Sequence, residues 1–136
     1  MAGGVEAYFT SRTPAGVVSA YLFGSHARGT AHAESDVDVA VVLAYGALAT
    51  RADRSRAAGR LATDLIAATH CNAVDVVVLN DASPELAAAV VTHGRRLYCA
   101  DGAAEHAFVR TVLLRHADLR PFLRRTRRLK AQVLAR

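Results

Sequence analysis

The chain has 136 residues, of which 52% are hydrophobic, and 17 basic against 12 acidic side chains give it a formal net charge of +5. These values exclude a disordered or fibrous protein and predict one globular domain over residues 1–136, large enough to bury a core. The charge is uneven, because residues 110–136 hold nine basic groups and one acid, whereas residues 1–109 hold eight basic groups and eleven acids.

The first half of the chain predicts two helical segments and two strands. Residues 4–12 suit a short helix, and the apolar run 17–23 predicts a strand that stops abruptly at Gly24. A short helix is expected over 26–33. The apolar run 37–43 is typical of a buried strand.

The second half predicts helices alternating with strands. We expect a helix over 51–70, a strand over 74–79, a helix over 84–93, an edge strand over 96–99 and a last helix from 101 to about 119. This order is typical of an α/β layer fold. In the helix over 51–70, apolar side chains recur at three- and four-residue spacings and charged ones surround them. The apolar set is Ala57, Ala58, Leu61, Leu65 and Ala68, and the charged set is Arg54, Arg56, Arg60 and Asp64.

Three residues predict where the later helices begin and end. Ser83 and Asp101 have the side chains that cap a helix N-terminus. Gly94 is expected to stop the helix over 84–93.

Two acids stand directly ahead of a buried strand. Asp36 and Asp38 are two residues apart, so both carboxylates are expected on one face while Val37 and Val39 point into the core. Neighbouring carboxylates repel each other and resist dehydration, and a divalent cation between them removes that cost. Because carboxylate oxygens are hard ligands, the pair predicts a Mg²⁺ site.

The turn at Gly24 and Ser25 supplies a complementary part. Glycine lets the backbone approach a ligand closely, and free N–H groups at a helix start bind phosphate. Ser25 adds a hydroxyl donor, and Arg28 lies one helical turn further on. Together with the acid pair, this turn predicts a site for a metal-bound nucleoside triphosphate.

A third acid, Asp75, lies in the otherwise valine-rich run 74–79. Taken alone, it could mark the exposed start of a strand. In a chain that also carries Asp36 and Asp38, we interpret Asp75 as a buried third catalytic carboxylate.

The spacing of these residues resembles a known signature. Gly24 and Ser25, followed after ten residues by Asp36-x-Asp38, resemble the motif of polymerase-β-like nucleotidyltransferases. The run FGSHARGTAHAESDVDVAVVL resembles the minimal nucleotidyltransferases (MNT), small bacterial proteins usually encoded beside a HEPN-domain partner, and VDVVVLNDASPELAAAVVTHGRRLY resembles their second half. The likeness covers about residues 15–100. It implies a nucleotidyltransferase fold, a small mixed β-sheet of about four strands with helices packed on it.

The resemblance also implies a function. The chain is expected to transfer AMP from ATP to a tyrosine hydroxyl of a HEPN ribonuclease toxin, and so to act as the antitoxin of that pair. Asp36 and Asp38 would hold two Mg²⁺ ions, and Asp75 would share the metal beside the attacking oxygen. Gly24 and Ser25 would hold the β- and γ-phosphates.

Several alternatives stay open. Arg28 can contact the triphosphate or pair with Glu34, and Ser35 can be a nucleotide ligand or a turn-stabilising hydroxyl. The chain could instead be a non-catalytic antitoxin that acts by complex formation. A nucleotidyltransferase acting on a small molecule such as an aminoglycoside is the other alternative.

The C-terminal segment 102–136 predicts a basic helical segment with one apolar face. Its arginines could face solvent, dock on an acidic protein surface, or bind nucleic acid. Nucleic acid is disfavoured, because Phe122 is the one aromatic residue among these arginines. The apolar face comprises Phe108, Val109, Val112, Leu113, His116, Leu119, Phe122 and Leu123.

Nothing in the sequence predicts export or a membrane. The first residues do not resemble a signal peptide, and no apolar run approaches the roughly 20 residues of a membrane helix. Cys71 and Cys99 are expected to be small buried side chains in a reducing compartment. We therefore expect a cytoplasmic protein.

Overall fold

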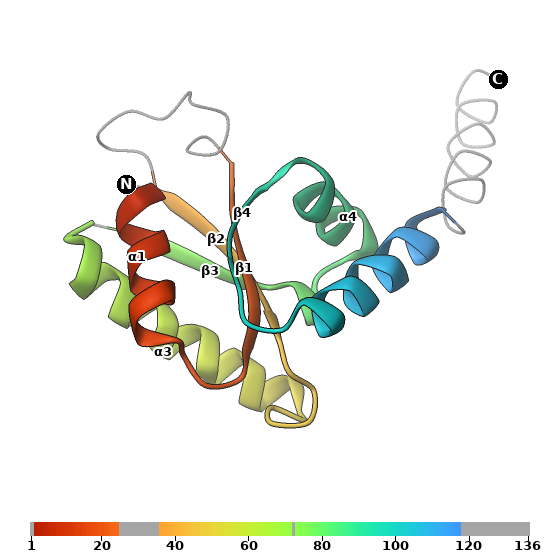
Figure 1. Cartoon of the computed structure of the whole chain (residues 1–136), viewed down its shortest axis with the longest axis horizontal. Coiled ribbons are helices and arrows are strands. Elements are labelled where there is room, and N and C mark those ends of the chain that lie inside the picture. Colours follow the sequence, from red (N-terminus) through yellow and green to blue (C-terminus); the bar gives the residue numbers. More distant parts are fainter. Residues whose placement is uncertain (1, 25–35, 72, 118–136) are drawn as a thin grey trace, which may run out of the picture.

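The computed structural model describes residues 2–24, 36–71 and 73–117 (Figure 1). The predicted order of helices and strands is confirmed for these residues, whereas the short helix predicted over 26–33 lies outside them. The elements are α1 (Ala2–Arg12), β1 (Val17–Phe23), β2 (Val37–Leu43), α3 (Arg51–Thr69), β3 (Val74–Val78), α4 (Pro84–His93), β4 (Arg95–Cys99) and a helix over 102–117, called the C-terminal helix below.

The described strands form one mixed sheet in the order β3-β2-β1-β4. Strand β1 runs antiparallel to β2 and β4, and β2 runs parallel to β3. The predicted mixed α/β fold is confirmed, and β4 is an edge strand as expected. Because β1 runs antiparallel to the other three strands, its last residue lies at the same end of the sheet as their first residues.

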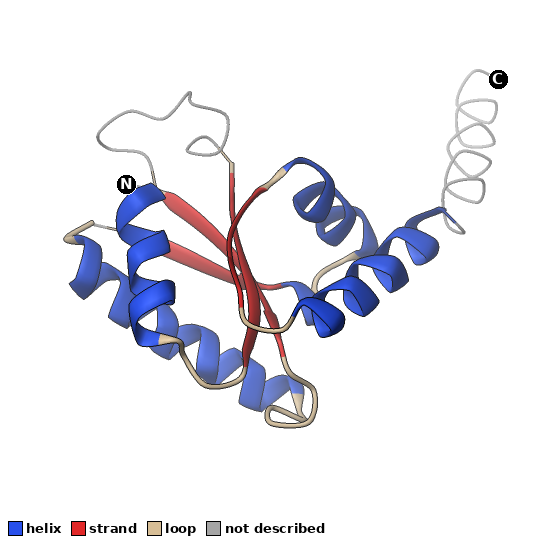
Figure 2. Cartoon of the chain, viewed as in Figure 1, coloured by secondary structure: helices blue, strands red, loops and turns tan. Residues whose placement is uncertain are grey.

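Helices α1 and α3 cover one face of the sheet (Figure 2). Alternate side chains of β2 point into this layer, and Val37, Val39 and Val41 are fully buried there. The predicted inward direction of Val37 and Val39 is confirmed. The rest of this core comprises Val5, Tyr8, Phe9, Val17, Ala20, Leu22, Leu43, Leu61, Leu65, Val74 and Leu97.

Helix α4 and the C-terminal helix cover the opposite face. Ala40 and Val42, the intervening residues of β2, pack there with Val90 of α4 and Val112 of the C-terminal helix. Asp38 alternates in step with Ala40 and Val42, so its side chain belongs to this second face at the start of β2.

The predicted helix ends are confirmed. Ser83 Oγ accepts a hydrogen bond of 3.2 Å from the Leu86 N–H, and Asp101 Oδ1 accepts one of 3.1 Å from the Ala104 N–H. Helix α4 ends before Gly94, whose φ of −70° is ordinary. Glycine is required there for space, since a Cβ would crowd the carbonyl oxygens of Val90 and Leu22.

Two strand boundaries differ from the prediction by one residue. Strand β3 stops at Val78 because Leu79–Asp81 turn into a short 3-10 helix, η1. Strand β4 begins at Arg95, where pairing with Leu22 of β1 starts.

A buried carboxylate that the sequence did not reveal holds the C-terminal helix on the sheet. Glu105 accepts a hydrogen bond of 2.7 Å from the Tyr21 hydroxyl on β1 and forms an ion pair of 2.6 Å with Arg96 on β4. Burial and the hydrogen bond to Glu105 raise the pKa of the Tyr21 hydroxyl to about 12. The helix is thus fixed by polar contacts to two strands.

The apolar face predicted for the C-terminal helix is partly wrong. Val112 is buried and Phe108 packs against it, whereas Leu113 is 43% exposed. The stripe that meets the sheet follows Glu105, Phe108 and Val112 at helical spacing, which turns Leu113 away. The predicted residues beyond 117 lie outside the described part of the chain, so the role of the basic tail stays a prediction.

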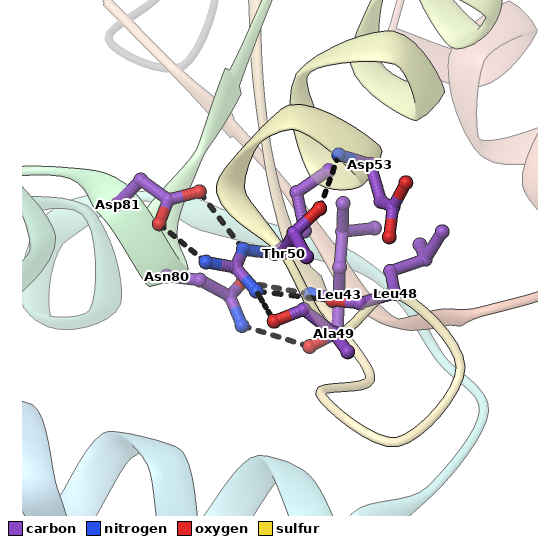
Figure 3. Close-up of polar contacts among 8 residues, drawn as sticks. Leu43, Leu48, Ala49, Thr50, Asp53, Asn80 and Asp81 are labelled. Atoms are coloured by element: carbon purple, nitrogen blue, oxygen red, sulfur yellow. Dashed lines mark hydrogen bonds and ion pairs between the residues drawn. The ribbon is translucent and has the colours of Figure 1, made fainter.

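Arg54 corrects a second prediction. We expected it among the charged residues around the apolar face of α3, but it is only 7% exposed. Its guanidinium binds Asp81 Oδ2 and Oδ1 at 2.9 and 2.8 Å, and the carbonyl oxygens of Leu48 and Ala49 at 3.0 and 3.2 Å (Figure 3). These four hydrogen bonds satisfy the guanidinium and join the 44–50 loop to η1.

Asn80 completes this arrangement at the end of β2. Its amide nitrogen donates to the Leu43 carbonyl at 2.8 Å, and its amide oxygen accepts from the Leu43 N–H at 2.9 Å (Figure 3). The Asn80 side chain thereby makes the two hydrogen bonds to Leu43 that a residue of a paired strand would make, at a point where β3 has already ended. Leu43, Arg54, Asn80 and Asp81 are called the clamp below.

The two cysteines are free thiols, and both are half-buried rather than fully buried as expected. Among the described residues, no helix combines the length and the apolar character needed to span a bilayer.

Candidate active site

Four chain segments meet at one end of the sheet, where β2, β3 and β4 start and β1 stops. Gly24 directly follows β1, Asp36 directly precedes β2, Asp75 is the second residue of β3, and Gly94 directly precedes β4. The strand order therefore places the starts of β3 and β2, the end of β1 and the start of β4 in a row along this edge. We call it the acid edge.

Asp38 and Asp75 are direct partners in the parallel register of β2 and β3. Adjacent strands lie roughly 4.8 Å apart, and paired residues project from the same face, so the two carboxylates are close neighbours. Asp38 is half-buried and Asp75 is exposed. The predicted burial of Asp75 is wrong, because β3 is an edge strand and its start lies at the open end of the sheet.

Gly24 is fixed by two separate requirements. Its φ of +75° lies in the left-handed region, which favours glycine. A Cβ at this position would also overlap the Asp38 carboxylate oxygen Oδ2. The backbone at the end of β1 therefore lies directly against the Asp38 side chain.

Asp36 is exposed and lies directly before the first residue of β2, two residues from Asp38, at the acid edge. The structure thus brings together four predicted site residues: Gly24, Asp36, Asp38 and Asp75. The other three predicted site residues, Ser25, Arg28 and Ser35, lie outside the described residues.

The donor atoms at the acid edge suit a hard divalent cation. Carboxylate oxygens from adjacent strands are ligands that Mg²⁺ takes, usually together with waters and substrate phosphates. Within the described part of the chain, no three Asp, Glu, His or Cys side chains gather closely enough to form a complete metal site on their own. The expected Mg²⁺ therefore stays a prediction.

A family model described as "Polymerase beta, Nucleotidyltransferase" matches residues 6–103, a range that contains the acid edge. The chain belongs to this nucleotidyltransferase family. The resemblance stated from the Gly24-Ser25 and Asp36-x-Asp38 spacing is confirmed, and so is the predicted fold class.

The chain is similar to a named bacterial protein and to solved structures of toxin–antitoxin proteins. The chain is 38% identical over 92 residues to the protein adenylyltransferase MntA of Shewanella oneidensis, a match that takes in 68% of this chain and 61% of that relative. The chain therefore spans less than two thirds of that relative's length. A crystal structure of a toxin–antitoxin with AMP-PNP matches with a TM-score of 0.70 and 26% identity, covering 98% of both chains. A structure of tri-AMPylated Shewanella oneidensis HEPN toxin in complex with MNT antitoxin matches in fold, with a TM-score of 0.66, 23% identity and coverage of 98% and 99%.

The sequence did not predict a cavity beside Gly24. A cavity of about 360 Å³ adjoins Gly24, between the end of β1 and the outer face of α4. Leu86, Ala89 and His93 lie at positions i, i+3 and i+7 of α4, spacing that puts them on one helix face. That spacing, directly before Gly94 and β4, was the signal available in the sequence.

A further cavity of about 650 Å³ lies elsewhere in the described structure. It opens between the end of β2 near Leu43, the start of α4 and the C-terminal helix. Leu43 is five residues from Asp38, or about 16 Å along a strand. This cavity is therefore separate from the acid edge of the nucleotidyltransferase.

Proposed function

We propose that this chain is a Mg²⁺-dependent protein adenylyltransferase that moves AMP from ATP to a tyrosine hydroxyl of a cognate HEPN ribonuclease toxin, and so acts as its antitoxin. The observation that carries this proposal is the register pair Asp38–Asp75 with Gly24 packed against Asp38. Membership of the nucleotidyltransferase family supports the reaction class. The adenylyltransferase relative and the matched toxin–antitoxin structure with an ATP analogue support ATP and a protein acceptor.

Asp36, Asp38 and Asp75 would hold Mg²⁺ at the acid edge. When bound, Mg²⁺ supplies positive charge that offsets the charge developing on the triphosphate. The backbone that follows Gly24 and the Ser25 hydroxyl would hold the β- and γ-phosphates, which aims the α-phosphorus along the edge toward β3. Arg28 and Ser35 are further candidate contacts of the nucleotide.

The position of Asp75 supports an acceptor at the β3 end of the acid edge. A tyrosine hydroxyl has a pKa near ~10, so it must lose its proton to become a good nucleophile near neutral pH. The exposed Asp75 carboxylate, at the outer end of the row, is open to a partner protein and can take that proton. The phenolic oxygen then bonds to the α-phosphorus as the bond to pyrophosphate breaks, which leaves AMP on the tyrosine.

Transfer can be tested by intact-mass spectrometry of the purified HEPN partner after incubation with this chain, ATP and Mg²⁺. We expect the partner's mass to rise in steps of one AMP, and to stay unchanged when Mg²⁺ is chelated. Glu6→Gln, an exposed change on α1, is a matched control that should behave as the wild type. An unchanged partner mass under all conditions would reject the proposal.

A second measurement separates catalysis from simple complex formation. Cells carrying the toxin would be rescued either by the wild-type chain or by an Asp38→Asn variant. We expect the variant to lose rescue although it still binds the toxin. Equal rescue by both chains would show that neutralisation needs only the complex.

We place the reaction in the cytoplasm, where ATP is available and where free thiols such as Cys71 and Cys99 are ordinary.

A further inference from the structure

The cavity of about 650 Å³ at the end of β2 lies apart from the acid edge, and one of its walls is the C-terminal helix. The lining residues of this wall recur at three- and four-residue spacing, so they form one helix face. They are Ala104, Ala107, Phe108, Thr111, Val112 and Arg115, preceded by Asp101 before the helix. The opposite wall consists of the end of β2, η1 and the start of α4. We call this cavity the helix groove.

The helix groove is long and narrow. Asp101 and Arg115 are 14 residues apart, which corresponds to about 21 Å along a helix. Spread over that length, the volume of about 650 Å³ gives a mean cross-section of about 31 Å². A helix with its side chains is about 10 Å across, so the groove cannot enclose a helix of another protein. It has room for a thin, extended molecule.

The floor of the helix groove is apolar. It is formed by Val18, Val42, Leu79 and Val112, together with the ring of Phe108. An extended peptide would lay main-chain N–H and C=O groups against this floor without partners, which costs free energy. A hydrocarbon chain carries no such groups. The groove therefore suits an acyl chain better than a peptide segment.

The uncharged polar side chains of the groove leave this apolar character intact. Both ends of the Asn80 amide bind the main chain of Leu43, and the Thr111 hydroxyl donates to the Ala107 carbonyl at 3.0 Å. Tyr45 is 56% exposed and adds the surface of its ring at the rim. The amide and the Thr111 hydroxyl are thus already used within the fold.

The two charged residues of the lining stand at opposite ends of the groove. Asp101 lies at the start of the C-terminal helix, where Oδ1 accepts the Ala104 N–H at 3.1 Å. Arg115 lies four turns further on, is exposed, and forms no hydrogen bond or ion pair with any residue that the structure describes. An anionic head group is therefore repelled at Asp101 and attracted at Arg115.

We propose that the helix groove binds a free single-chain carboxylate, with the acyl chain on the apolar floor and the head group at Arg115. The proposal does not depend on nucleotide transfer, because the groove and the acid edge lie at opposite ends of β2. A bound chain would contact both the C-terminal helix and the clamp residues Leu43 and Asn80. It should therefore raise the melting temperature of the protein.

The first test varies the length of the acyl chain. Octanoate, decanoate and dodecanoate are titrated into the full-length protein by calorimetry, below their micelle concentrations. Each added pair of methylenes should raise the affinity by about fivefold or more, because it buries further apolar surface. Equal affinity for the three carboxylates, or no binding of any of them, would overturn the proposal.

Filling the groove tests where the chain binds. Ala107→Trp places an indole in the groove, and Ala103→Trp is the matched control at an exposed position of the same helix outside the lining. Decanoate affinity should fall about tenfold or more in Ala107→Trp and change by less than about twofold in the control. Unchanged affinity in Ala107→Trp would place the chain elsewhere. Equal loss in both variants would show a general disturbance of the helix and would also reject the site.

Arg115→Gln tests the position of the head group, and Arg110→Gln is its control at an exposed position outside the groove. Decanoate affinity should fall about fivefold or more in Arg115→Gln, whereas decanol, which has the same chain without the charge, should bind as it does to the wild type. The control should change neither ligand. An unaltered ratio of decanoate to decanol affinity in Arg115→Gln would show that Arg115 does not hold the carboxylate.

The remaining arm separates a free ligand from a membrane lipid. Vesicles of phosphatidylglycerol present an anionic head group with acyl chains that stay in the bilayer. We expect the wild-type chain to bind free decanoate and not to sediment with these vesicles. Sedimentation with the vesicles, without binding of free decanoate, would assign the groove to a membrane lipid and overturn the proposal.

Discussion

Polar side chains at the two ends of β2 have opposite kinds of neighbours. At the clamp, Arg54 binds both carboxylate oxygens of Asp81, and Asn80 binds both main-chain groups of Leu43. At the acid edge, a carboxylate stands in register with another carboxylate, and the residue packed against it is a glycine. The clamp thus joins groups of opposite charge, whereas the acid edge places two like charges beside each other.

This difference separates polar groups that serve stability from those that serve binding. A buried charge costs free energy unless a partner compensates it, and at the clamp the partner is part of the chain. Like charges placed together also cost free energy, and at the acid edge a bound cation would repay that cost. A substitution at the acid edge should therefore lower activity more than stability, and one at the clamp should do the reverse. Three predictions test this contrast, and a fourth concerns the C-terminal helix.

The largest expected effect is at the acid edge. Asp38→Asn should lower the rate of AMP transfer by about 10³-fold or more, because a neutral amide is a poor ligand for Mg²⁺. The unfolding midpoint should change little, since Asn has nearly the same shape as Asp and the repulsion with Asp75 is relieved. Rates are measured by labelled-ATP transfer, and midpoints by thermal circular dichroism. A strong loss of stability would show that Asp38 is a structural residue, which would break the comparison.

Gly24→Ala should lower transfer by about 10²-fold, because the new methyl group overlaps the Asp38 carboxylate. Gly16→Ala is the matched control, since Gly16 has a similar φ of +81° but lies against Leu48 at the far end of the sheet. Both variants should lose roughly 1 kcal/mol of stability from backbone strain. Only the Gly24 variant should lose activity per folded molecule. Equal activity in the two variants would separate Gly24 from catalysis.

A change at the clamp should have the reverse pattern. Asp81→Asn should lower the melting temperature by roughly 10 °C, because it leaves the buried Arg54 without its carboxylate. Transfer per folded molecule should stay within about twofold. Arg56→Ala breaks only the exposed pair with Asp53 and is the control, with a shift of about 1–2 °C. A loss of catalysis in Asp81→Asn without a loss of stability would contradict the division between the two ends.

The smallest effect concerns the anchor of the C-terminal helix and appears only at alkaline pH. The pKa of Tyr21 is raised from 10.0 to about 12, so the folded state favours the protonated hydroxyl. Its stabilisation is fully present below pH 10 and is lost as the pH rises toward 12. Urea denaturation between pH 8 and about 11.5 should show a falling free energy of unfolding that is shallower in Tyr21→Phe. Parallel curves would mean that ionisation of Tyr21 does not contribute to the loss of stability at alkaline pH.

Much of the fold could be predicted from the sequence, and so could the residues that meet at the acid edge. The strands 17–23 and 37–43 follow from short apolar runs with sharp ends, and the acid pair follows from a two-residue spacing on a strand. The alignment of Asp75 with Asp38 could not be derived, because it depends on which strands pair and in which register.

The buried charges were harder to predict, since local sequence does not show which partner a charge will meet. Arg54 shares its helical stripe with Ala58, Leu61 and Leu65, a spacing that places it on the inner face. Its partner Asp81 is 27 residues away, so charge alone suggested an exposed arginine. Glu105 was missed for the same reason, because its partners Tyr21 and Arg96 lie on two strands.

The central claim is that the acid edge transfers AMP to a partner protein. The most direct measurement incubates the HEPN partner with ATP radiolabelled at either the α- or the γ-phosphate, using the wild-type chain and an Asp36→Ala, Asp38→Ala double variant. We expect label on the partner only from α-labelled ATP and only with the wild-type chain. Label from the γ-phosphate, or α-label transferred equally by the double variant, would contradict it.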